Sequence, residues 1–244
     1  MNVEIIKCLK DNYSYLITDS DRNSIVIDPS ESDPIIKIIE KKKLNLKFIL
    51  NTHHHFDHIG GNDELKKKYS SEIVGFKKDK DRIPGIDISV SDNEVWKSGN
   101  FEAKIIYIPG HTSGHIAFYF YKNEILFSGD TLFSLGCGRV FEGTHEDMYN
   151  SLSKFKSLPL STKVYCGHEY TYNNSLFCIK YDSENIMLKK KIIEIEKKLR
   201  KKEPTIPSTI KDELECNIFL RAKTLAEFSK LRDLKDNFYF IILD

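Results

Sequence analysis

Four of the eight histidines in the sequence and one aspartate lie within residues 53–58, directly after the apolar run Phe48–Ile49–Leu50. Neutral imidazole and carboxylate are common ligands of zinc, iron and manganese, and a short turn at the end of a strand can direct several of them at one point. A solvated polar loop or an affinity tag is the alternative explanation. A tag would lie at a terminus, however, and short histidine-rich tracts usually bind metal, so this stretch predicts a metal site.

Three further candidate ligands each follow a separate apolar segment that is expected to form a strand. His111 follows 105–110, Asp130 follows 124–129, and His168 follows 163–167. Each alone would be weak evidence, because a single histidine at a strand end is more often a satisfied surface or core residue. Several strand ends that deliver polar side chains together are typical of sites in layered α/β folds, where a rigid sheet holds the residues and the loops stay open.

The candidate ligands are His53, His55, Asp57, His58, His111, Asp130 and His168. These seven side chains exceed what one tetrahedral ion uses, because a catalytic zinc takes about three protein ligands and keeps one position open. We therefore expect two divalent metal ions. Zinc is the expected metal, and iron and manganese also accept this set of nitrogen and oxygen donors.

The spacing of these ligands suggests how they divide. His53 and His55 alternate along an extended segment and can face one ion. Asp57 and His58 can turn toward a second ion, and the two oxygens of Asp130 can bridge the pair. Two cations about 3.5–4 Å apart lower the pKa of a shared water, so that hydroxide forms near neutral pH. The pattern predicts metal-assisted hydrolysis, with Asp57 and Asp130 as the catalytic carboxylates.

The other histidines are expected outside this site. His54 lies between two ligands and would point the other way on an extended chain, which indicates a structural role. His115 and His145 are at most supporting or surface residues on this evidence.

The apolar pattern predicts two groups of strands with helices in the intervals. The first group is expected at 3–9, 13–18, 24–28, 46–50 and 72–75, with helices at 28–43 and 60–69. The second group is expected at 94–97, 101–108, 115–121, 124–128 and 164–166, with a helix at 146–157. This order predicts a four-layer αββα sandwich over residues 1–172, with two sheets packed face to face and helices outside.

Residues 173–244 are expected to form a small helical C-terminal domain beside the metal site. Leu188, Ile192, Ile195 and Leu199 fall on one helical stripe with charged residues opposite, and Pro204 ends the pattern. A further helix is expected over 224–231.

Composition excludes several classes of protein. Lys plus Arg is 37 and Asp plus Glu is 36, so the near balance argues against a general nucleic-acid or membrane-surface role. No apolar run approaches the roughly 20 residues of a membrane span. Five cysteines without a CxxC pair indicate neither a disulfide framework nor a zinc ribbon. The chain begins in strand-like sequence with no signal peptide pattern, and a cytoplasmic protein is expected.

The motifs around the candidate ligands resemble the metallo-β-lactamase superfamily. They are HHHFDH at 53–58, PGHT at 109–112, SGDT at 128–131 and GHEY at 167–170. One branch is more similar: DNY at 11–13, GCGR at 136–139, CGHEYT at 166–171 and PTIPST at 204–209 resemble glyoxalase II, the hydroxyacylglutathione hydrolases. The similarity runs over essentially the whole chain, and it implies the same αββα fold.

This resemblance implies a thioester hydrolase that converts S-D-lactoylglutathione and water to D-lactate and glutathione through a metal-bridging hydroxide, the second step of methylglyoxal detoxification. It implies one ion at His53, His55 and His111 and another at Asp57, His58 and His168, with Asp130 between them. The helical tail would bind the glutathione part, and a monomer is expected. The implied substrate-binding residues are Arg139, Phe141, Tyr170, Arg232 and Lys235.

The sequence departs from the family at two positions. Phe141 stands where the family usually has a tyrosine that contacts glutathione, and losing one hydrogen bond of about 0.5–1.5 kcal/mol predicts binding that is weaker by up to about tenfold. Ile218 stands where the family tends to have proline, with no predictable effect.

Other functions fit parts of the pattern. A glutathione persulfide dioxygenase shares much of the ligand set but uses one iron and generally lacks a basic helical tail. A lactonase or a β-lactamase on the same fold would open a ring without releasing a thiol. A protein that only stores or senses metal would leave the GCGR motif at 136–139 and the helical tail without an explanation.

Overall fold

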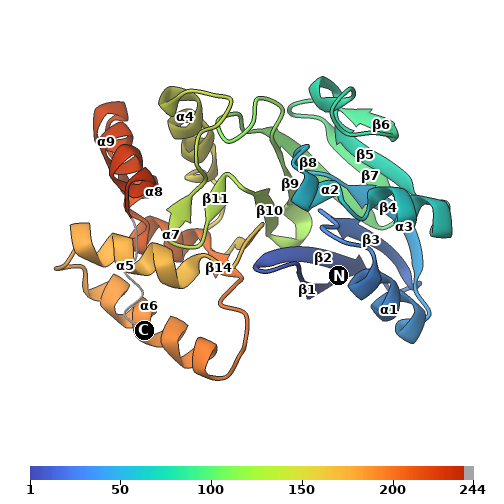
Figure 1. The fold of residues 1–244 in the computed structure, drawn as a ribbon, viewed down its shortest axis with the longest axis horizontal. Helices are drawn as coiled ribbons and strands as arrows, with labels where there is room; N and C mark the ends of the chain where they lie inside the picture. Colours follow the sequence, from blue (N-terminus) through green and yellow to red (C-terminus); the bar gives the residue numbers. More distant parts are fainter. Residues whose placement is uncertain (239–244) are drawn as a thin grey trace.

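A computed structural model describes residues 1–238 of the 244. They form two six-stranded sheets that face each other, with helices on both outer faces (Figure 1). The predicted αββα sandwich is therefore confirmed. The last residues of the predicted helical tail, 239–244, lie outside the described part of the chain.

The first sheet runs in chain order from β1 to β6. Its strands are β1 (Asn2–Cys8), β2 (Asn12–Thr18), β3 (Asn23–Ile27), β4 (Asn45–Leu50), β5 (Glu72–Phe76) and β6 (Ile86–Val90). The first three pair antiparallel, and β3 to β6 pair parallel. Strand β6 was not predicted.

Helices cover the outer face of this sheet and lead into the site. They are α1 (Asp33–Lys42), α2 (Phe56–Ile59) and α3 (Asn62–Tyr69), followed by the 3-10 turn η1 (Lys77–Asp79). Ile35, Ile36 and Ile39 of α1 are buried against the sheet. This helix begins later than the predicted residue 28, because Asp28 adopts a left-handed backbone (φ 47°) and its carboxylate accepts hydrogen bonds from Thr52.

The second sheet has the strand order β14-β13-β10-β9-β8-β7. Its strands are β7 (Val95–Ser98), β8 (Phe101–Tyr107), β9 (Ile116–Phe120), β10 (Ile125–Gly129), β13 (Lys163–Cys166) and β14 (Ser208–Thr209), with η2 (Tyr121–Asn123) joining β9 to β10 and α4 (His145–Phe155) outside. Only β10 and β13 pair parallel. A small hairpin, β11 (Leu132–Phe133) and β12 (Gly136–Cys137), leaves the end of β10.

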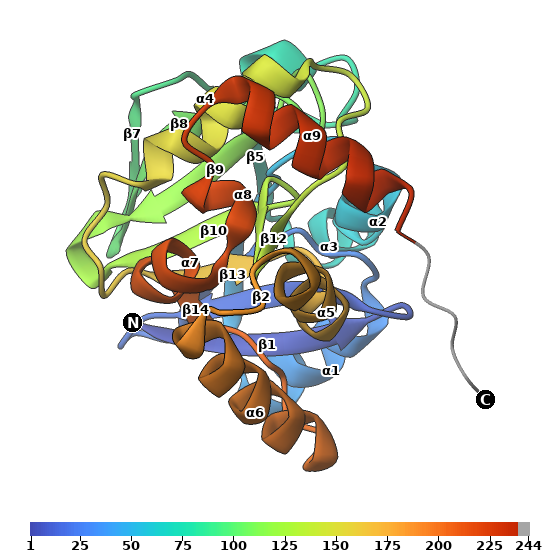
Figure 2. The same cartoon turned by 90° about the vertical axis from the view of Figure 1, so that its left-hand side faces the viewer.

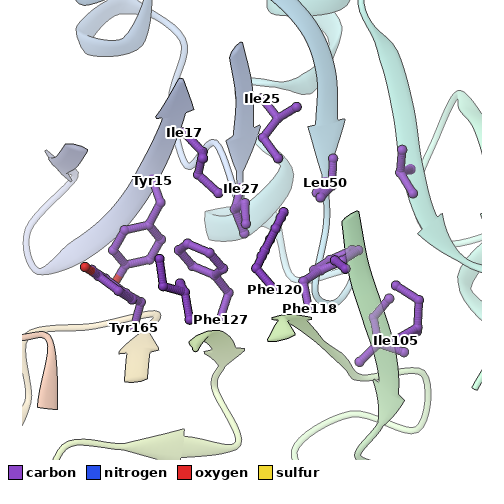
Figure 3. Close-up of a cluster of buried hydrophobic side chains, with 14 of the residues drawn as sticks. Tyr15, Ile17, Ile25, Ile27, Leu50, Ile105, Phe118, Phe120, Phe127 and Tyr165 are labelled. Carbon is purple, nitrogen blue, oxygen red and sulfur yellow. The ribbon is translucent and has the colours of Figure 1, made fainter. Parts of the chain in front are cut away.

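Aromatic and branched side chains fill the space between the sheets. Tyr15 and Ile27 of the first sheet meet Phe118, Phe127 and Tyr165 of the second (Figure 3). Strand β2 is buried along most of its length. One of its faces lies between the two sheets, and α1 covers the other. This core gives the strand ends a rigid support.

The C-terminal helices pack beside the second sheet (Figure 2). They are α5 (Thr171–Tyr181), α6 (Ile186–Arg200), α7 (Ile210–Cys216), α8 (Ile218–Arg221) and α9 (Leu225–Asp236). The predicted helices correspond to α6 and α9, and α9 extends five residues beyond the predicted end at 231. Helices α5, α7 and α8 were not predicted, nor was β14, which adds a strand from this region to the second sheet. Within residues 1–238, no helix is long and apolar enough to cross a membrane.

Candidate metal centre

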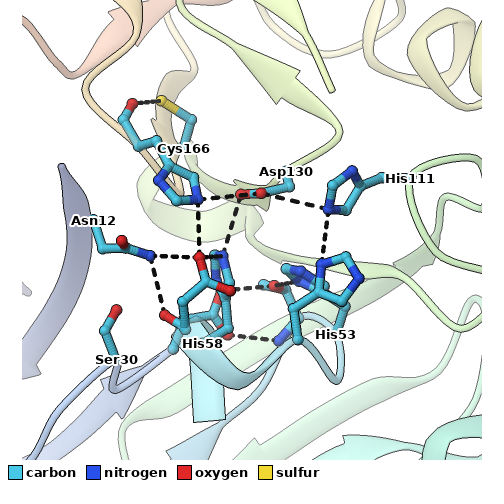
Figure 4. A network of polar contacts seen from close by, with 12 residues as sticks. Asn12, Ser30, His53, His58, His111, Asp130 and Cys166 are labelled. Atoms are coloured by element: carbon cyan, nitrogen blue, oxygen red, sulfur yellow. Dashed lines mark hydrogen bonds and ion pairs between the residues drawn. The ribbon is translucent and has the colours of Figure 1, made fainter. Parts of the chain in front are cut away.

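The seven predicted ligands meet at one edge of the two sheets. His53 comes three residues after β4, His111 four residues after β8, Asp130 directly after β10 and His168 two residues after β13. Strands β8, β10 and β13 run in the same direction, so their ends deliver side chains to the same place. Figure 4 shows Asp130 between His111 and His58 in this network.

In residues 1–238 the potential ligand atoms form three groups, of which two consist only of predicted ligands and the third joins Asp28 to His53 and His58. His53, His55 and His111 make up the first ligand group, and Asp57, His58 and His168 make up the second. Within each group, one potential ligand atom from every residue lies within 4.8 Å of the others. This division is the one that the resemblance implied, and the ligand roles themselves stay a prediction.

Asp130 lies between the two groups. Its Oδ2 is 3.5 Å from His111 Nε2 and 3.3 Å from His168 Nε2, and its Oδ1 is 3.4 Å from His58 Nε2. The carboxylate is buried. A single side chain therefore contacts residues of both groups, as a bridging ligand must.

Buried polar atoms in this centre fit a cation. His53 Nε2, His58 Nε2 and Asp130 Oδ1 have no hydrogen-bond partner among residues 1–238, and an unpartnered buried polar atom costs about 1–3 kcal/mol. His55 Nδ1 and His111 Nε2 also face each other at 3.1 Å. Divalent cations such as zinc accept imidazole nitrogen and carboxylate oxygen, so the residues present fit two of them.

The two groups differ in charge. Burial lowers the pKa of His53 well below its usual value, and burial together with the neighbouring His111 lowers the pKa of His55 to about 4. Burial opposes the charged form of His58 and His168 too, but the negative charge of the nearby Asp130 carboxylate raises their pKa to about 10 and about 11. Without metal, the first group is therefore neutral at pH 7, whereas His58 and His168 hold protons.

The outer nitrogen of most of these histidines has a partner. His53 Nδ1 lies 3.0 Å from Thr52 Oγ1, His58 Nδ1 lies 3.1 Å from Asp28 Oδ2, His111 Nδ1 lies 2.8 Å from Arg139 O, and His168 Nδ1 lies 2.8 Å from Asp11 Oδ1. Such contacts fix the ring orientation and leave the other nitrogen for a metal.

Several supporting residues were not predicted as part of the site. Asp28 directly follows β3, and Asn12 donates to Asp57 Oδ2 at 2.9 Å. His115 is buried rather than at the surface: its Nε2 accepts the Asp130 N–H at 3.1 Å, and its ring stacks on His53. The only local signal for Asp28 and Asn12 is a polar residue at a strand end, and a single histidine such as His115 carries none.

His54 and His145 lie away from the two ligand groups. His54 Nε2 is 3.3 Å from Glu142 Oε1, and its Nδ1 is 3.7 Å from Asp79 Oδ2. His145 is at the start of α4, near Asp233. The expectation that neither points at the metals agrees with this placement.

The five predicted substrate-binding residues fall into two sets. Tyr170 stacks on His168 with ring centroids 4.7 Å apart, and Phe141, which is 60% exposed, lies 5.2 Å from the His111 ring. Arg139 is exposed and bonds to Asp236. These three lie at or near the mouth of the centre.

Arg232 and Lys235 lie deeper. Arg232 is only 4% exposed, and its guanidinium donates to Cys137 O at 2.7 Å and to Asp236 Oδ1 at 2.8 Å. Lys235 is partly buried with its ammonium over the Phe177 ring, and burial and the Arg232 charge lower its pKa to about 8. Direct glutathione contacts by both residues stay a prediction, because the structure gives Arg232 a partner in the protein backbone.

Comparison with known proteins matches the chain in two parts. Residues 10–168 match the family described as the metallo-beta-lactamase superfamily, and residues 169–238 match the family described as hydroxyacylglutathione hydrolase C-terminus. The protein named hydroxyacylglutathione hydrolase from Pelagibacter ubique (strain HTCC1062) is 64% identical, over 98% of this chain and 100% of that protein. A protein of the same name from Prochlorococcus marinus (strain MIT 9301) is 46% identical over 96% of each chain.

Solved structures share the fold at lower identity. The BLEG-1 B3 metallo-beta-lactamase superposes with a TM-score of 0.71 at 23% identity, over 91% of this chain and 100% of that chain. ETHE1 from Myxococcus xanthus superposes with a TM-score of 0.73 at 22% identity, over 96% and 90%. At this identity the likeness supports the architecture alone.

Proposed function

Because the chain belongs to the hydroxyacylglutathione hydrolases of the metallo-β-lactamase superfamily, we propose that it hydrolyses S-D-lactoylglutathione to D-lactate and glutathione. It is a thioester hydrolase of the glyoxalase pathway, which removes methylglyoxal. The observation that carries this function is the pair of ligand groups that share Asp130, together with the family matches over residues 10–168 and 169–238.

Two divalent ions, with zinc the proposed metal, fit the two ligand groups. His53, His55 and His111 would hold one ion, Asp57, His58 and His168 the other, and Asp130 would contact both. When bound, such ions lower the pKa of a shared water and polarise a carbonyl oxygen. The protein's own contribution is to hold seven side chains in place before substrate arrives, which avoids reorganisation during the reaction.

The side chains around the centre account for the rest of the reaction. Asp11, Asp28 and Arg139 O orient the metal-facing histidines, and Asn12 holds Asp57. The leaving thiol has a pKa of about 8.5, so it can depart as a thiolate and needs no strong proton donor in the site. Water supplies the oxygen of the new carboxylate; one of its protons goes to the thiol and the other to the solvent.

We propose that Tyr170, Phe141 and Arg139 contact the glutathione part outside the metals, with Lys235 contributing positive charge. The substrate carries carboxylates at both ends of the tripeptide, which suits an arginine and a lysine. Phe141 lacks a hydroxyl and contributes only its ring.

The remaining proposals concern organisation and location. We divide the chain into a catalytic domain at 1–172 and a glutathione-binding domain at 173–244, and we expect a monomer because one chain supplies every proposed ligand. All five cysteines are unpaired and buried, which suits a reducing compartment such as the cytoplasm.

The direct test follows thiol release from S-D-lactoylglutathione with a colorimetric thiol reagent and measures D-lactate separately. The zinc-loaded protein should release both products in equal amounts, and chelation should stop the reaction until zinc is restored. Absence of thiol release by protein that contains two zinc ions would exclude this function.

A parallel assay separates the alternative. Oxygen consumption with glutathione persulfide by iron-loaded protein would indicate a dioxygenase, and ring opening of a lactone or β-lactam without thiol release would indicate the other activities of this fold. We expect none of these at a rate comparable to thioester hydrolysis.

A further inference from the structure

The hairpin segment 134–138, the stretch from the turn of the β11–β12 hairpin to Gly138, is held by side chains of the C-terminal helices. Every backbone carbonyl in this segment accepts a bond from them. The donors are Asn174 to Ser134 O at 3.1 Å, Cys178 to Leu135 O at 3.2 Å, Asn217 to Gly136 O at 3.0 Å, and Arg232 to Cys137 O at 2.7 Å and Gly138 O at 3.4 Å. Strand β12 lies against α5 and α8 (Figure 2).

Glu213 and Asn217 form the centre of this support. Glu213 is fully buried on α7, and its Oε2 accepts the Leu135 N–H and the Asn217 amide, each at 2.9 Å. Leu135 adopts a left-handed backbone with φ 58°, a conformation that is costly for leucine. The Glu213 carboxyl therefore stabilises the turn where the chain itself does not favour it.

The same segment touches the metal centre at its other end. Gly138 passes so close to the Asp130 backbone that a Cβ there would lie 1.9 Å from Asp130 O and 3.3 Å from His111 Nδ1. The next residue, Arg139, accepts the His111 Nδ1–H with its carbonyl at 2.8 Å. The position of the segment thus determines the orientation of one residue in the first ligand group.

We propose that Glu213 and Asn217 are positioning residues that set the orientation of His111 through the backbone of 134–139, and so control binding of the ion at the first ligand group. Within residues 1–238, neither residue bonds to a proposed metal ligand of the second group or to a proposed substrate-binding side chain. The helical region therefore has a role in metal binding as well as in holding glutathione. This inference rests on the proposed role of His111 as a ligand.

The test uses the full chain with paired substitutions. Glu213→Leu removes the acceptor for Leu135 and Asn217, whereas Glu213→Gln keeps an oxygen at Oε2. Burial raises the pKa of Glu213 to about 7, so the neutral shape that glutamine imitates is populated near pH 7. Lys211→Ala, an exposed change on the same helix, is the control for altering α7.

Zinc affinity at each group is measured by competition with a chromophoric chelator, and ¹H–¹⁵N spectra report the His111 Nδ1–H. Loss of a contact that orients a metal ligand typically weakens metal binding by about 10- to 100-fold. We expect Glu213→Leu to weaken zinc binding at the first group by this factor and to shift the His111 signal. Zinc affinity at the second group should change by less than about twofold. Glu213→Gln should restore the affinity of the first ion.

Two outcomes for folded Glu213→Leu would overturn the proposal: both ions bound with wild-type affinity, or both weakened equally. If this variant does not fold, Asn217→Asp decides by the same criteria, because it keeps the oxygen that caps the Phe219 N–H at 3.0 Å and removes the donor to Gly136. Failure of the wild-type protein to bind two ions would refute the proposed metal site itself. Wild-type binding of two ions with no effect of either variant would refute only this inference.

Discussion

The two ligand groups share Asp130 but depend on different parts of the molecule. The second group is held by side chains at strand ends of the first sheet: Asp11 contacts His168, Asn12 contacts Asp57 and Asp28 contacts His58. In the first group, His111 is held by a backbone carbonyl of a loop that the C-terminal helices fix. The second group therefore depends on the sandwich, whereas His111 of the first group also depends on the helical region.

Charge separates the groups as well. The first group consists of three neutral imidazoles at pH 7, because burial lowers the pKa of His53, His55 and His111. In the second group, the nearby Asp130 carboxylate raises the pKa of His58 and His168. The two sites should consequently differ in metal affinity, in dependence on pH and in sensitivity to substitution.

The largest effect is expected where the groups meet. Asp130→Ala should lower the affinity of both ions by more than the roughly 10- to 100-fold that loss of a supporting contact costs, and should abolish thiol release. Elemental analysis after dialysis and the thiol assay measure both effects. Asp130→Asn, which keeps one oxygen acceptor, is the matched control and should retain more metal. Near-native turnover of Asp130→Ala would show that the groups do not share this residue.

A substitution on the sandwich side should affect only the second group. Asp11→Ala removes the acceptor at 2.8 Å from His168 Nδ1, so the second ion should bind about 10- to 100-fold more weakly while the first changes little. Chelator competition measures both affinities, and Lys10→Ala in the same turn is the control. Equal weakening of both ions would mean that the groups are not independently supported.

Proton release distinguishes the groups by pH. A histidine binds a metal only in its neutral form, so filling the second group at pH 7 should release about two protons from His58 and His168, and filling the first should release almost none. Affinity at the second group should therefore fall as pH falls, by up to about 100-fold per unit, because protons compete for both rings. Affinity at the first group should stay nearly constant between pH 6.5 and pH 8, because the histidines of this group are already neutral in that range.

Calorimetric titration with zinc in two buffers of different ionisation enthalpy measures these protons. His55→Ala, which disables the first group, isolates the second. Equal proton release at both groups would contradict the charge difference.

The sequence predicted one part of this arrangement better than the other. The seven candidate ligands and the sandwich follow local patterns, because apolar runs mark strands and polar residues mark their ends. The supports depend on contacts between distant residues: Asp28 and His58 are 30 positions apart, and Cys137 and Arg232 are 95. No local pattern shows that Arg232, in a charged helix, is buried.

The missed elements have a similar cause. Strand β14 has two residues and exists only because β13 offers an edge, and α7 and α8 are too short to show a helical period. Their stability comes from packing against the second sheet and the hairpin. The region that most needs tertiary contacts to form is thus the one that supports the first ligand group.

The smallest effect is expected at the mouth of the centre, where Phe141 packs on His55 and His111 of the first group and Tyr170 stacks on His168 of the second. Phe141→Tyr adds a hydroxyl that can donate to the glutathione backbone, worth about 0.5–1.5 kcal/mol, so KM for S-D-lactoylglutathione should fall by about two- to tenfold with kcat little changed. A short lactoyl thioester without the tripeptide is the control, and its KM should not move. An unchanged KM for the glutathione thioester would place the tripeptide away from this side, next to Tyr170 and the second group.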